Sequence, residues 1–369
     1  MKFSVKSNEF QECFQKVVGV IPTKTTLSIL NGILFHLEGD VLELTGTDLE
    51  ISLRTKLQVE GEIDGSIVLP GKDLHNLFRA LPETSVTFDV DDKMIARIIT
   101  SAGEYEYPGE NSSEFPALPQ FEIKNKVEID SELFIRMIEK TIFAVSSGEI
   151  RSSLMGLYLQ FFTNELRAVS TDRHRLVKIK KEFNIGEEFG GHIVSTKALN
   201  LLLRSIEDKE KISLMLSENY MVFDIQESVI YSRLLEGMYP DYDKVIPPDN
   251  NNTLKINREM LESSLRRMAI CSNKITQQIK LDISKDKVEL YAEDPDSGKK
   301  GKESIPAEFD GENLIIGYNV NYLADILRHI DTEDILFTFS GPTNAGLIYP
   351  SKQQEKEELL MLIMPIKIN

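Results

Sequence analysis

The sequence LPGKDLHNLFRALP, residues 69–82, decides how the chain can be organised. Its apolar side chains recur at positions i, i+3, i+4 and i+7, the spacing of one face of an α-helix: Leu74, Leu77, Phe78 and Leu81. At about 100° per residue, Arg79 lies nearly opposite that face. The stretch therefore predicts a helix over residues 71–81 that buries one side and presents a cation to solvent.

The same pattern returns twice, in STKALNLLLRSIE (195–207) and in NVNYLADILRHI (319–330). The equivalent apolar faces are Leu199, Leu202, Leu203 and Ile206 in one, and Leu323, Ile326, Leu327 and Ile330 in the other. Arg204 and Arg328 stand where Arg79 stands in the first copy. Self-similarity at a near-constant interval predicts a chain built from three copies of one unit.

Other positions keep the same interval, which strengthens the repeat. Gly32 and Gly156 are separated by the same distance in sequence as Thr47-Asp48 and Thr171-Asp172. Each copy reads as strand–helix–strands, twice over, which predicts an antiparallel α+β fold and not a parallel βαβ sheet.

We expect helices at 8–20, 71–81, 131–145, 196–206, 257–271 and 319–330. We expect domains at 1–122, 123–250 and 251–369, joined by the proline-bearing segments NSSEFPALPQ (111–120) and GMYPDYDKVIPPDNNN (237–252).

Composition narrows the class of protein. The 369 residues allow two or three domains, and 41% apolar content supplies a core for each. No apolar run approaches the ~20 residues of a membrane span, and the start MKFSVKSNEF has no signal-peptide core, so we expect no membrane association. Cys13 and Cys271 lie far apart without a CxxC motif. That usage suits a reducing compartment, predicts a cytoplasmic protein, and excludes a disulfide framework or a cysteine zinc site.

The net charge of −17, taken alone, argues against a nucleic-acid partner, because phosphate binding needs cations. The placement of charge matters more than its sum, however. Cations recur on the polar faces of the six expected helices. The second helix of each copy carries Lys72, Arg79, Lys197, Arg204 and Arg328, and the first carries Lys16, Arg136, Lys140, Arg266 and Arg267. These faces either line one surface that meets a polyanion or are ordinary solvated helix faces.

Two clusters suggest a binding or catalytic site. The run Thr171–Arg175 is densely polar, and a hydrolase centred on Asp172 and His174 is one hypothesis. The chain has no nucleophile elbow, HExxH, P-loop or GxGxxG, and Asp48 holds the place of Asp172 in the first copy, which favours a structural aspartate. The second cluster consists of turn and terminus residues expected to be exposed although apolar: Leu154, Leu176, Tyr239, Pro240, Val245, Met364 and Pro365. It indicates either a peptide groove or interdomain packing.

Runs along the whole chain then match one family in order. They are MKFSV (1–5), TLSILNGILF (26–35), LTGTDLEI (44–51), EFPALP (114–119), IRSSLMGLYL (150–159), STDRHRLVKI (170–179), GMYPDYDKVIP (237–247), IGYNVNYLADIL (316–327) and LIMPIKIN (362–369). With these runs the chain resembles the bacterial sliding clamp, the beta subunit of the replicative DNA polymerase III holoenzyme.

The resemblance implies three clamp domains, each made of two βαβββ halves, and a ring-shaped homodimer of six domains. Twelve helices would line the hole around duplex DNA and antiparallel sheets would form the outside. The protein would be a non-catalytic processivity factor without metal or cofactor. Its partners would be duplex DNA, encircled without sequence preference, the polymerase alpha subunit, the clamp loader, and repair polymerases and mismatch-repair proteins that bind through short peptides. A repeat scaffold that binds peptides without DNA is the alternative.

The resemblance also implies particular site residues. The partner-peptide groove would use Leu154, Thr171, His174, Arg175, Leu176, Pro240, Lys244, Val245, Leu362, Met364 and Pro365, with apolar walls for an anchor residue and His174 and Arg175 for polar ends. Ile270 and Cys271 match family positions at the dimer interface.

This sequence departs from the family pattern at several points. Arg173 stands where the family often has glycine, and Lys244 where some members have arginine. Ser152-Ser153 replaces a tyrosine pair associated with DNA contact. Lys24 keeps a cation, expected to face DNA, in a loop where the family often has arginine.

Overall fold

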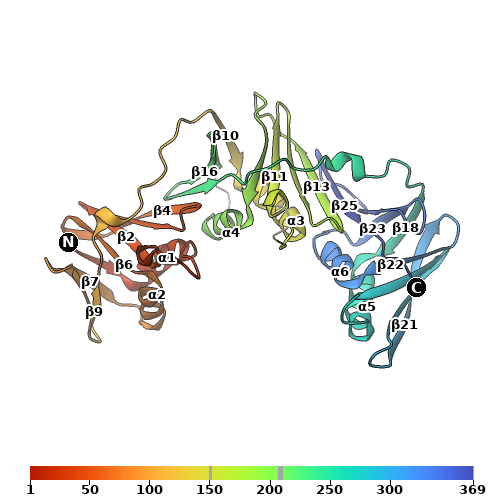
Figure 1. Cartoon of the computed structure of the whole chain (residues 1–369), viewed down its shortest axis with the longest axis horizontal. Coiled ribbons are helices and arrows are strands. Elements are labelled where there is room, and N and C mark those ends of the chain that lie inside the picture. Colours follow the sequence, from red (N-terminus) through yellow and green to blue (C-terminus); the bar gives the residue numbers. More distant parts are fainter. Residues whose placement is uncertain (149–151, 207–210, 369) are drawn as a thin grey trace. The chain divides into compact units, whose positions relative to one another are not determined.

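The computed structural model describes residues 1–148, 152–206 and 211–368. Within them the chain forms three repeats, each of two βαβββ halves, and six α-helices (Figure 1). Ile150 and Arg151, which open one of the family-like runs, lie outside the described residues, as do Glu207 and Asn369. The expected antiparallel α+β pattern is confirmed, since every strand pairing in the described part is antiparallel.

The elements follow the same order in each repeat. The first repeat has β1 (Lys2–Lys6), α1 (Ser7–Val18), β2 (Gly32–Glu38), β3 (Val41–Thr47), β4 (Ile51–Gln58), a short β5 (Glu60–Ile63), β6 (Gly65–Pro70), α2 (Gly71–Ala80), β7 (Ser85–Val90), β8 (Ile95–Ile99) and β9 (Glu104–Pro108). The second has β10 (Asn125–Asp130), α3 (Ser131–Thr141), β11 (Gly156–Phe162), β12 (Glu165–Thr171), β13 (Arg175–Glu182), β14 (Gly190–Ser195), α4 (Thr196–Ser205), β15 (Lys211–Leu216), β16 (Tyr220–Ile225) and β17 (Ser228–Arg233). The third has β18 (Asn252–Asn257), α5 (Arg258–Cys271), β19 (Gln278–Ser284), β20 (Lys287–Asp294), β21 (Lys299–Asp310), β22 (Leu314–Asn319), α6 (Val320–Arg328), β23 (Asp334–Phe339), β24 (Gly346–Pro350) and β25 (Glu357–Ile363).

The chain divides by its contacts into two compact units. Unit 1 comprises Met1–Ile135 with Lys197–Leu234, and unit 2 comprises Arg136–Thr196 with Leu235–Asn369. The division falls inside the middle repeat because each of its sheets continues into a neighbouring repeat. Strand β17 pairs with β4 in unit 1, and β13 pairs with β25 in unit 2.

Unit 1 contains two sheets of the described residues, ordered β5-β1-β7-β8-β9 and β10-β15-β16-β17-β4-β3-β2-β6. Its core in the first repeat is aromatic. Phe10 on α1 stacks on Phe14 and packs against Phe78 of α2, with ring centroids 4.3 Å apart in the second pair. The apolar helix face predicted from residues 74–81 therefore packs into the core: Leu74 and Phe78 are buried, whereas Arg79 is exposed.

Unit 2 contains one long sheet of the described residues, ordered β14-β11-β12-β13-β25-β24-β23-β18-β21-β20-β19-β22. The apolar tail segment expected to join a sheet does so as β25, which pairs with both β13 and β24. On α6 the predicted face Leu323, Ile326 and Leu327 is fully buried.

Five of the six expected helices end earlier than predicted, whereas α5 ends at Cys271 as expected. The expected helix 131–145 becomes α3, which ends at Thr141 and continues as a 3-10 turn over Ile142–Ala144. The backbone oxygen of Thr141 accepts a hydrogen bond from Ser170 Oγ at 2.6 Å. This tertiary contact and the 3-10 hydrogen bond from Val145 N to Ile142 O take the place of the α-helical pattern beyond Thr141.

Candidate functional site

The polar helix faces of unit 1 carry cations that are free of carboxylates. Arg79 on α2 and Arg204 on α4 are exposed, and neither has an ion-pair partner in the described structure. Arg204 and Lys16 line a hollow of about 520 Å³ between α1 and α4, together with Glu12, Gln15, Gly19 and Leu201. Lys24, in the loop after α1, is likewise exposed without an ion pair. Two helix faces from different repeats thus contribute cations to one surface.

Most of the other predicted DNA-facing cations are bound by the protein itself. Lys72 Nζ donates to Pro22 O at 3.1 Å, and Lys197 Nζ donates to Asp48 Oδ2 at 2.5 Å. In unit 2 the paired cations keep exposed side chains: Arg266 with Glu262, Arg267 with Glu303, and Arg328 with Asp325. Their charge is therefore partly neutralised where it stands.

Among the cations predicted to face DNA, Arg136 and Lys140 on α3 make the closest set of bonds to carboxylates of the protein itself. Arg136 Nε and Nη2 donate to the two oxygens of Glu357 at 2.9 and 2.8 Å, and the Glu357 side chain is only 1% exposed. Arg136 Nη1 and Lys140 Nζ both donate to Asp331, at 2.7 and 2.5 Å. Hydrogen bonding to Glu357 raises the pKa of Arg136 further above its ordinary value, against the opposing effect of burial. These two side chains join α3 to the third repeat and have little freedom to meet a ligand.

The predicted groove residues come together in unit 2. Leu154, Leu176 and Leu362 belong to one apolar cluster that also contains Tyr239 and Tyr242. Leu176 lies opposite both Thr171 across the β12–β13 hairpin and Leu362 on β25. Met364 N donates to the carbonyl of His174 at 2.8 Å, which fixes the C-terminal segment beside the hairpin.

The exposure of these residues differs from the expectation. Leu154, Leu176 and Tyr239 were predicted to be exposed, and this prediction is wrong: they are buried, at 3%, 2% and 7% exposure, because they pack into the cluster. Val245 and Met364 remain exposed, at 55% and 42%. The leucines thus form a buried apolar cluster, and the exposed Val245 and Met364 follow its members Tyr242 and Leu362 closely in the sequence. Pro240 and Pro365 are half-buried, and Lys244 is exposed and ion-paired to Asp241 at 2.8 Å.

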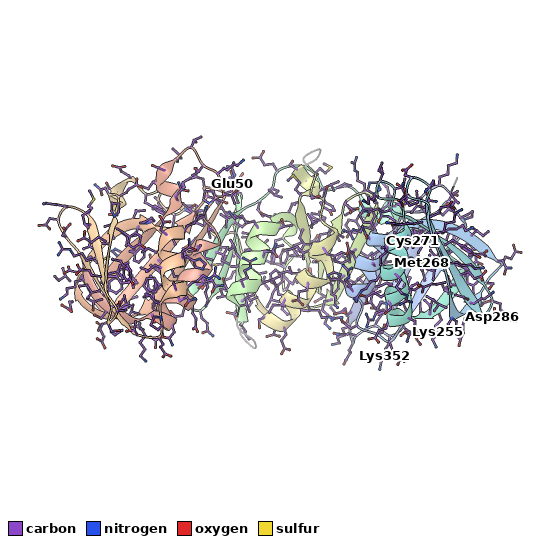
Figure 2. All side chains as sticks on the ribbon, turned by 90° about the horizontal axis from the view of Figure 1, so that it is seen from below. Glu50, Lys255, Met268, Cys271, Asp286 and Lys352 are labelled. Atoms are coloured by element: carbon purple, nitrogen blue, oxygen red, sulfur yellow. The ribbon has the colours of Figure 1, made fainter. Side chains whose placement is uncertain are left out.

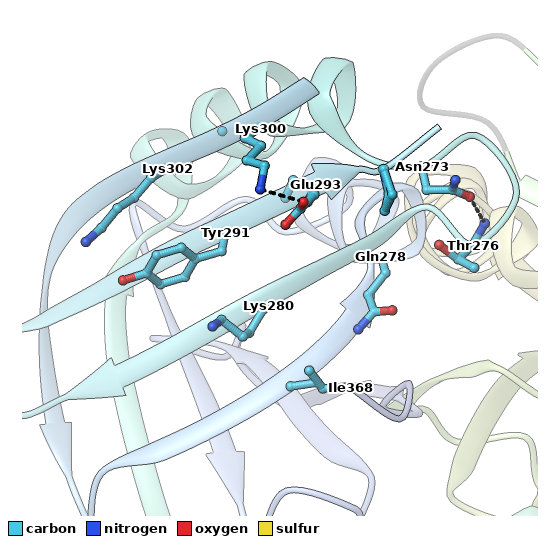
Figure 3. A pocket seen from close by; sticks show the side chains of 12 residues that line it. Asn273, Thr276, Gln278, Lys280, Tyr291, Glu293, Lys300, Lys302 and Ile368 are labelled. Atoms are coloured by element: carbon cyan, nitrogen blue, oxygen red, sulfur yellow. Dashed lines mark hydrogen bonds and ion pairs between the residues drawn. The ribbon is translucent and has the colours of Figure 1, made fainter. Parts of the chain in front are cut away.

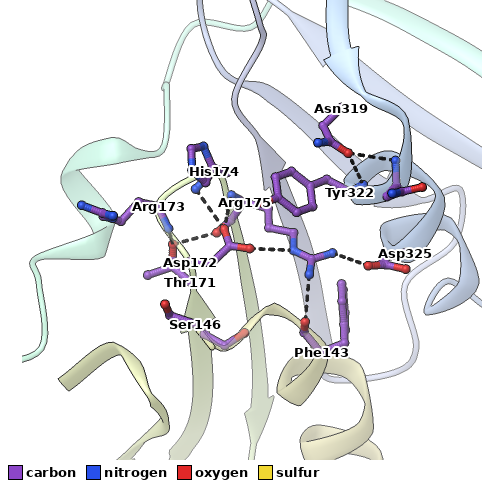
Figure 4. Close-up of polar contacts among 12 residues, drawn as sticks. Phe143, Ser146, Thr171, Asp172, Arg173, His174, Arg175, Asn319, Tyr322 and Asp325 are labelled. Carbon is purple, nitrogen blue, oxygen red and sulfur yellow. Dashed lines mark hydrogen bonds and ion pairs between the residues drawn. The ribbon is translucent and has the colours of Figure 1, made fainter. Parts of the chain in front are cut away.

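Arg175 is held on every side by groups of unit 2 (Figure 4). Its Nε donates to Asp172 Oδ2 at 3.1 Å, Nη1 to Asp325 Oδ2 at 2.8 Å and Nη2 to Phe143 O at 3.0 Å. Its guanidinium also lies over the rings of Phe143 and Tyr322. The resemblance implied that Arg175 fixes the polar end of a partner peptide. Here the side chain is buried and its donors are used within the protein, so it holds β13 and α6 together.

Asp172 has a structural role in the turn between β12 and β13. Its Oδ1 accepts from the backbone N of His174 and of Arg175, both at 2.9 Å. Asp48 does the same in the first repeat, accepting from Glu50 N and Ile51 N at 3.1 and 2.7 Å. His174 is exposed, and its ring lies 5.7 Å from that of Tyr322. The carboxylate orients the backbone and not the imidazole, so the pair lacks the geometry of an acid–base couple.

The same turn contains Arg173, one of the points where this sequence departs from the family pattern. Arg173 adopts φ 76°, and Leu49 in the equivalent turn adopts φ 77°. This left-handed backbone region favours glycine and costs other residues roughly 1–2 kcal/mol. The exposed Arg173 side chain has no hydrogen bond or ion pair in the described structure, and Figure 4 shows it directed away from the Arg175 network.

The segment before the third repeat holds contacts that sequence reasoning missed. Its 3-10 turn Tyr242–Val245 is bound to the sheet through Lys178 Nζ, which donates to Asp243 Oδ1 at 3.1 Å. Tyr242 Oη donates to Gln160, and the Tyr239 ring stacks on Tyr158 with centroids 4.5 Å apart. Burial raises the pKa of both Tyr239 and Tyr242. The two tyrosines of YPDY (239–242) could have predicted this packing, but the same run is also typical of a solvent-exposed linker.

The two interface residues implied by the resemblance lie at the end of α5. Ile270 is 69% exposed and Cys271 is half-buried. Figure 2 labels Cys271. Both cysteines of the chain are free thiols, with Cys13 buried.

Among the described residues no group of three or more His, Cys, Asp or Glu side chains is arranged to hold a metal ion. No helix in that part of the chain is long and apolar enough to cross a membrane.

Comparison with known proteins covers the whole chain. Residues 1–119 match the family described as DNA polymerase III beta subunit, N-terminal domain, residues 128–241 match its central domain, and residues 243–367 match its C-terminal domain. The beta sliding clamps of Bacillus subtilis and Synechococcus elongatus are 28% and 29% identical to it, each over 100% of both chains.

Solved structures agree with the sequence matches. A Pseudomonas aeruginosa DnaN sliding clamp bound to griselimycin superimposes with a TM-score of 0.94 at 27% identity, over 100% of both chains. The Bacillus subtilis clamp gives 0.93 at 27% identity, again over 100% of both chains. The expected three-domain clamp fold is thereby confirmed. The chain belongs to the DNA polymerase III beta subunit family, the beta sliding clamps, and is a non-catalytic processivity factor that works with DNA and a DNA polymerase.

Proposed function

We propose that two copies of this chain join head to tail into a ring of six domains that encloses duplex DNA. The observation that carries the proposal is the threefold repeat of a helix with a buried apolar face and an arginine opposite it, within a full-length match to sliding clamps. Domain boundaries near residues 122 and 250 are supported by β10 starting at Asn125 and β18 at Asn252. The helices would line the hole and the sheets would face outward.

Enclosure reconciles the charge of −17 with a DNA partner. A closed ring needs no tight contact, and a few phosphate contacts keep binding weak and independent of sequence. Arg79, Arg204 and Lys24 are the best candidates for such contacts, because none is neutralised by a carboxylate of the described residues. Lys197, Arg266, Arg267 and Arg328 are ion-paired and would contribute less, as would Lys72, whose ammonium donates to the carbonyl of Pro22. We assign Arg136 and Lys140 to joining α3 to the third repeat.

We further propose that unit 2 carries the groove for partner peptides. Leu154, Leu176 and Leu362 would form its floor, and Val245 and Met364 its apolar rim. Thr171, His174, Pro240, Lys244 and Pro365 border it, and Arg175 keeps the His174 turn in place. Its occupants would be short apolar-ended peptides of the polymerase alpha subunit, the clamp loader, repair polymerases and mismatch-repair proteins. Two free thiols support a reducing, cytoplasmic location.

Retention on circular DNA tests the ring. The protein is loaded by a clamp loader onto nicked circular DNA, the DNA is linearised, and release is followed by gel filtration. Retention on circles and loss on cutting are expected for a topological link. Equal release from both forms, or binding that survives linearisation, would refute enclosure.

Loss of the C-terminal segment tests the groove. Deleting Met364–Asn369 removes the residue that bonds to His174, and we expect partner-peptide binding to be abolished while the dimer persists. Met364→Ser is the smaller change, and Met260→Ser is its matched control, because Met260 on α5 is similarly exposed. Binding is measured by fluorescence polarisation of a labelled polymerase peptide. Full affinity after the deletion would overturn the assignment.

A further inference from the structure

A cavity of about 730 Å³ in unit 2 is lined by none of the proposed groove residues. It lies over strands β19, β20 and β21, on the sheet face that points away from the core. Ile279 and Leu281 are fully buried, so Lys280 between them projects to this opposite face. The function proposed above leaves this cavity without a role.

The register of the three strands gathers two ammonium groups around one aromatic ring. Lys280, Tyr291 and Lys302 are direct neighbours across β19, β20 and β21. Lys280 Nζ lies 4.3 Å and Lys302 Nζ 5.0 Å from the centroid of the Tyr291 ring. Figure 3 shows the three side chains in one row, with Ile368 on the far side of Lys280. We call this cavity the lysine pocket.

Cations outnumber carboxylates in the lysine pocket. Its lining includes Lys280, Lys300 and Lys302 but a single carboxylate, Glu293. Lys300 is paired with Glu293 at 2.7 Å, and Lys302 lies 3.2 Å from Glu289. Lys280 is half-buried and has no ion pair with any described residue. In a chain with a net charge of −17, this lining therefore complements a carboxylate of another molecule.

The C-terminal segment connects the lysine pocket with the groove. Met364 N donates to His174 O at the groove, and two residues later Ile366 N donates to Gly317 O at 2.8 Å. Ile368 then lines the pocket. A Cβ added to Gly317 would meet Ile368 Cγ1 at 2.9 Å, so the absence of a side chain at this position lets the segment lie against β22.

The same segment limits the distance between the two places. Met364 and Ile368 are four residues apart in the sequence. At about 3.3–3.6 Å per residue, their Cα atoms lie at most about 14 Å apart. An extended peptide seated in the groove reaches the lysine pocket with about four to six further residues.

We propose that the lysine pocket binds an acidic segment of the same partner protein whose apolar peptide occupies the groove. The inference rests on the groove proposed above and adds a charge requirement next to its apolar anchor. Lys280 would pair with an incoming carboxylate, and the amide of Gln278, two residues away on the same face, would donate a hydrogen bond to it. Partners with Asp or Glu close to the anchor would bind more tightly than partners without them.

Peptides with matched extensions test this on the full-length chain. Each labelled peptide carries the same apolar anchor and a six-residue extension rich in Asp and Glu, in Ser and Gln, or in Lys. The extension is N-terminal in one series and C-terminal in the other. Fluorescence polarisation gives the Kd at about 50 and 500 mM NaCl.

The variants are K280Q and K280E, with K285E as the matched control. Lys285 lies in the turn after β19, about 17 Å along the strand from Lys280 at about 3.4 Å per residue. It is exposed and has no ion pair in the part of the chain that the structure describes. Thermal melting verifies folding, and sedimentation verifies the oligomeric state.

In one of the two series we expect the wild type to bind the acidic extension about threefold to fivefold more tightly than the neutral one at low salt. The difference should vanish at high salt, since the charges are partly exposed. K280Q should reduce it below about twofold, and K280E should favour the lysine extension. K285E should leave the order of the peptides unchanged, and the neutral peptide should bind every protein equally.

The outcomes separate this inference from the groove itself. A wild type that binds none of the peptides would refute the groove. Equal Kd values for acidic and neutral extensions in both series would leave the groove standing and overturn the lysine pocket as an acid-binding site. A preference for acidic extensions that survives in K280E would overturn it as well. A changed oligomeric state of K280E with an unchanged peptide preference would assign the pocket to a contact between copies of the chain and likewise overturn the proposal.

Discussion

Replacing Arg136 by alanine distinguishes a structural cation from a DNA-binding one. The substitution leaves the Glu357 carboxylate, 1% exposed, without the arginine that donates to both of its oxygens. An uncompensated buried charge typically costs about 3–5 kcal/mol. We therefore expect a loss of about 3 kcal/mol.

The reciprocal change should cost less. In E357A, Arg136 keeps its bond to Asp331 at 2.7 Å, and its side chain is 23% exposed, so we expect a loss of about 1–2 kcal/mol. The double variant R136A/E357A has no unpaired buried charge and should recover about half of the loss seen in R136A. The pair would then show a clear coupling energy.

Scanning calorimetry measures these losses. For a domain of about 200 residues, ~1 kcal/mol corresponds to about 2–4 °C in Tm, so R136A should melt about 6–12 °C lower. Arg204→Ala is the matched control: Arg204 is exposed without an ion pair, and its loss should leave Tm nearly unchanged while weakening salt-dependent DNA binding. An unchanged Tm for R136A, or strictly additive losses in the double variant, would refute the reasoning.

Three further predictions follow from local geometry. Arg173→Gly should change the free energy of unfolding by no more than about 0.5 kcal/mol, because relief of the left-handed φ offsets the entropy of glycine. The loss of an exposed cation should, however, weaken the binding of acidic partner peptides. Leu49→Gly is the control and should leave the peptide Kd unchanged. Burial lowers the pKa of His329 below its ordinary value of about 6.5, so the folded protein favours the neutral ring and the free energy of unfolding should fall as pH drops through 6.5. In His329→Gln, the free energy of unfolding measured in urea should depend less on pH between 7.5 and 5.5. The same pH dependence in variant and wild type would contradict this. Gly61→Ala places a Cβ 1.9 Å from a backbone oxygen and should cost about 2 kcal/mol in thermal melts, whereas Gly103→Ala, in open space, should be near neutral.

Sequence reasoning reached the architecture because its signals are local. The 3.6-residue periodicity of residues 74–81 depends only on neighbours in the same helix, and the structure buries Leu74 and Phe78 while exposing Arg79. The Thr-Asp anchors at 47–48 and 171–172 also proved to be one turn repeated, with matching bonds from Asp48 and Asp172. The helix ends were less predictable, since α3 ends at Thr141, whose carbonyl accepts a hydrogen bond from Ser170 on β12.

The sequence could not assign roles to individual cations or apolar residues. Arg136 looks like any polar-face arginine, but its main partner, Glu357, lies 221 positions away in the chain. Arg175 looked like a ligand-binding cation until Asp172, Asp325 and Phe143 were found to take its donors. Leu154 and Tyr239 sit in a turn and a linker, which are usually exposed, yet the β12–β13–β25 surface buries them.

The sequence by itself determined the repeat, the helix faces and the family, because periodicity and ordered motifs need no knowledge of distant contacts. Only the tertiary structure decided which charges are neutralised by ion pairs and which leucines are buried in one cluster. Ion pairing and burial depend on segments brought together from far along the chain. That is why Arg79 and Arg136, equivalent in the sequence as cations on polar helix faces, differ in the fold: one is exposed and unpaired among the described residues, the other fixed to a buried carboxylate.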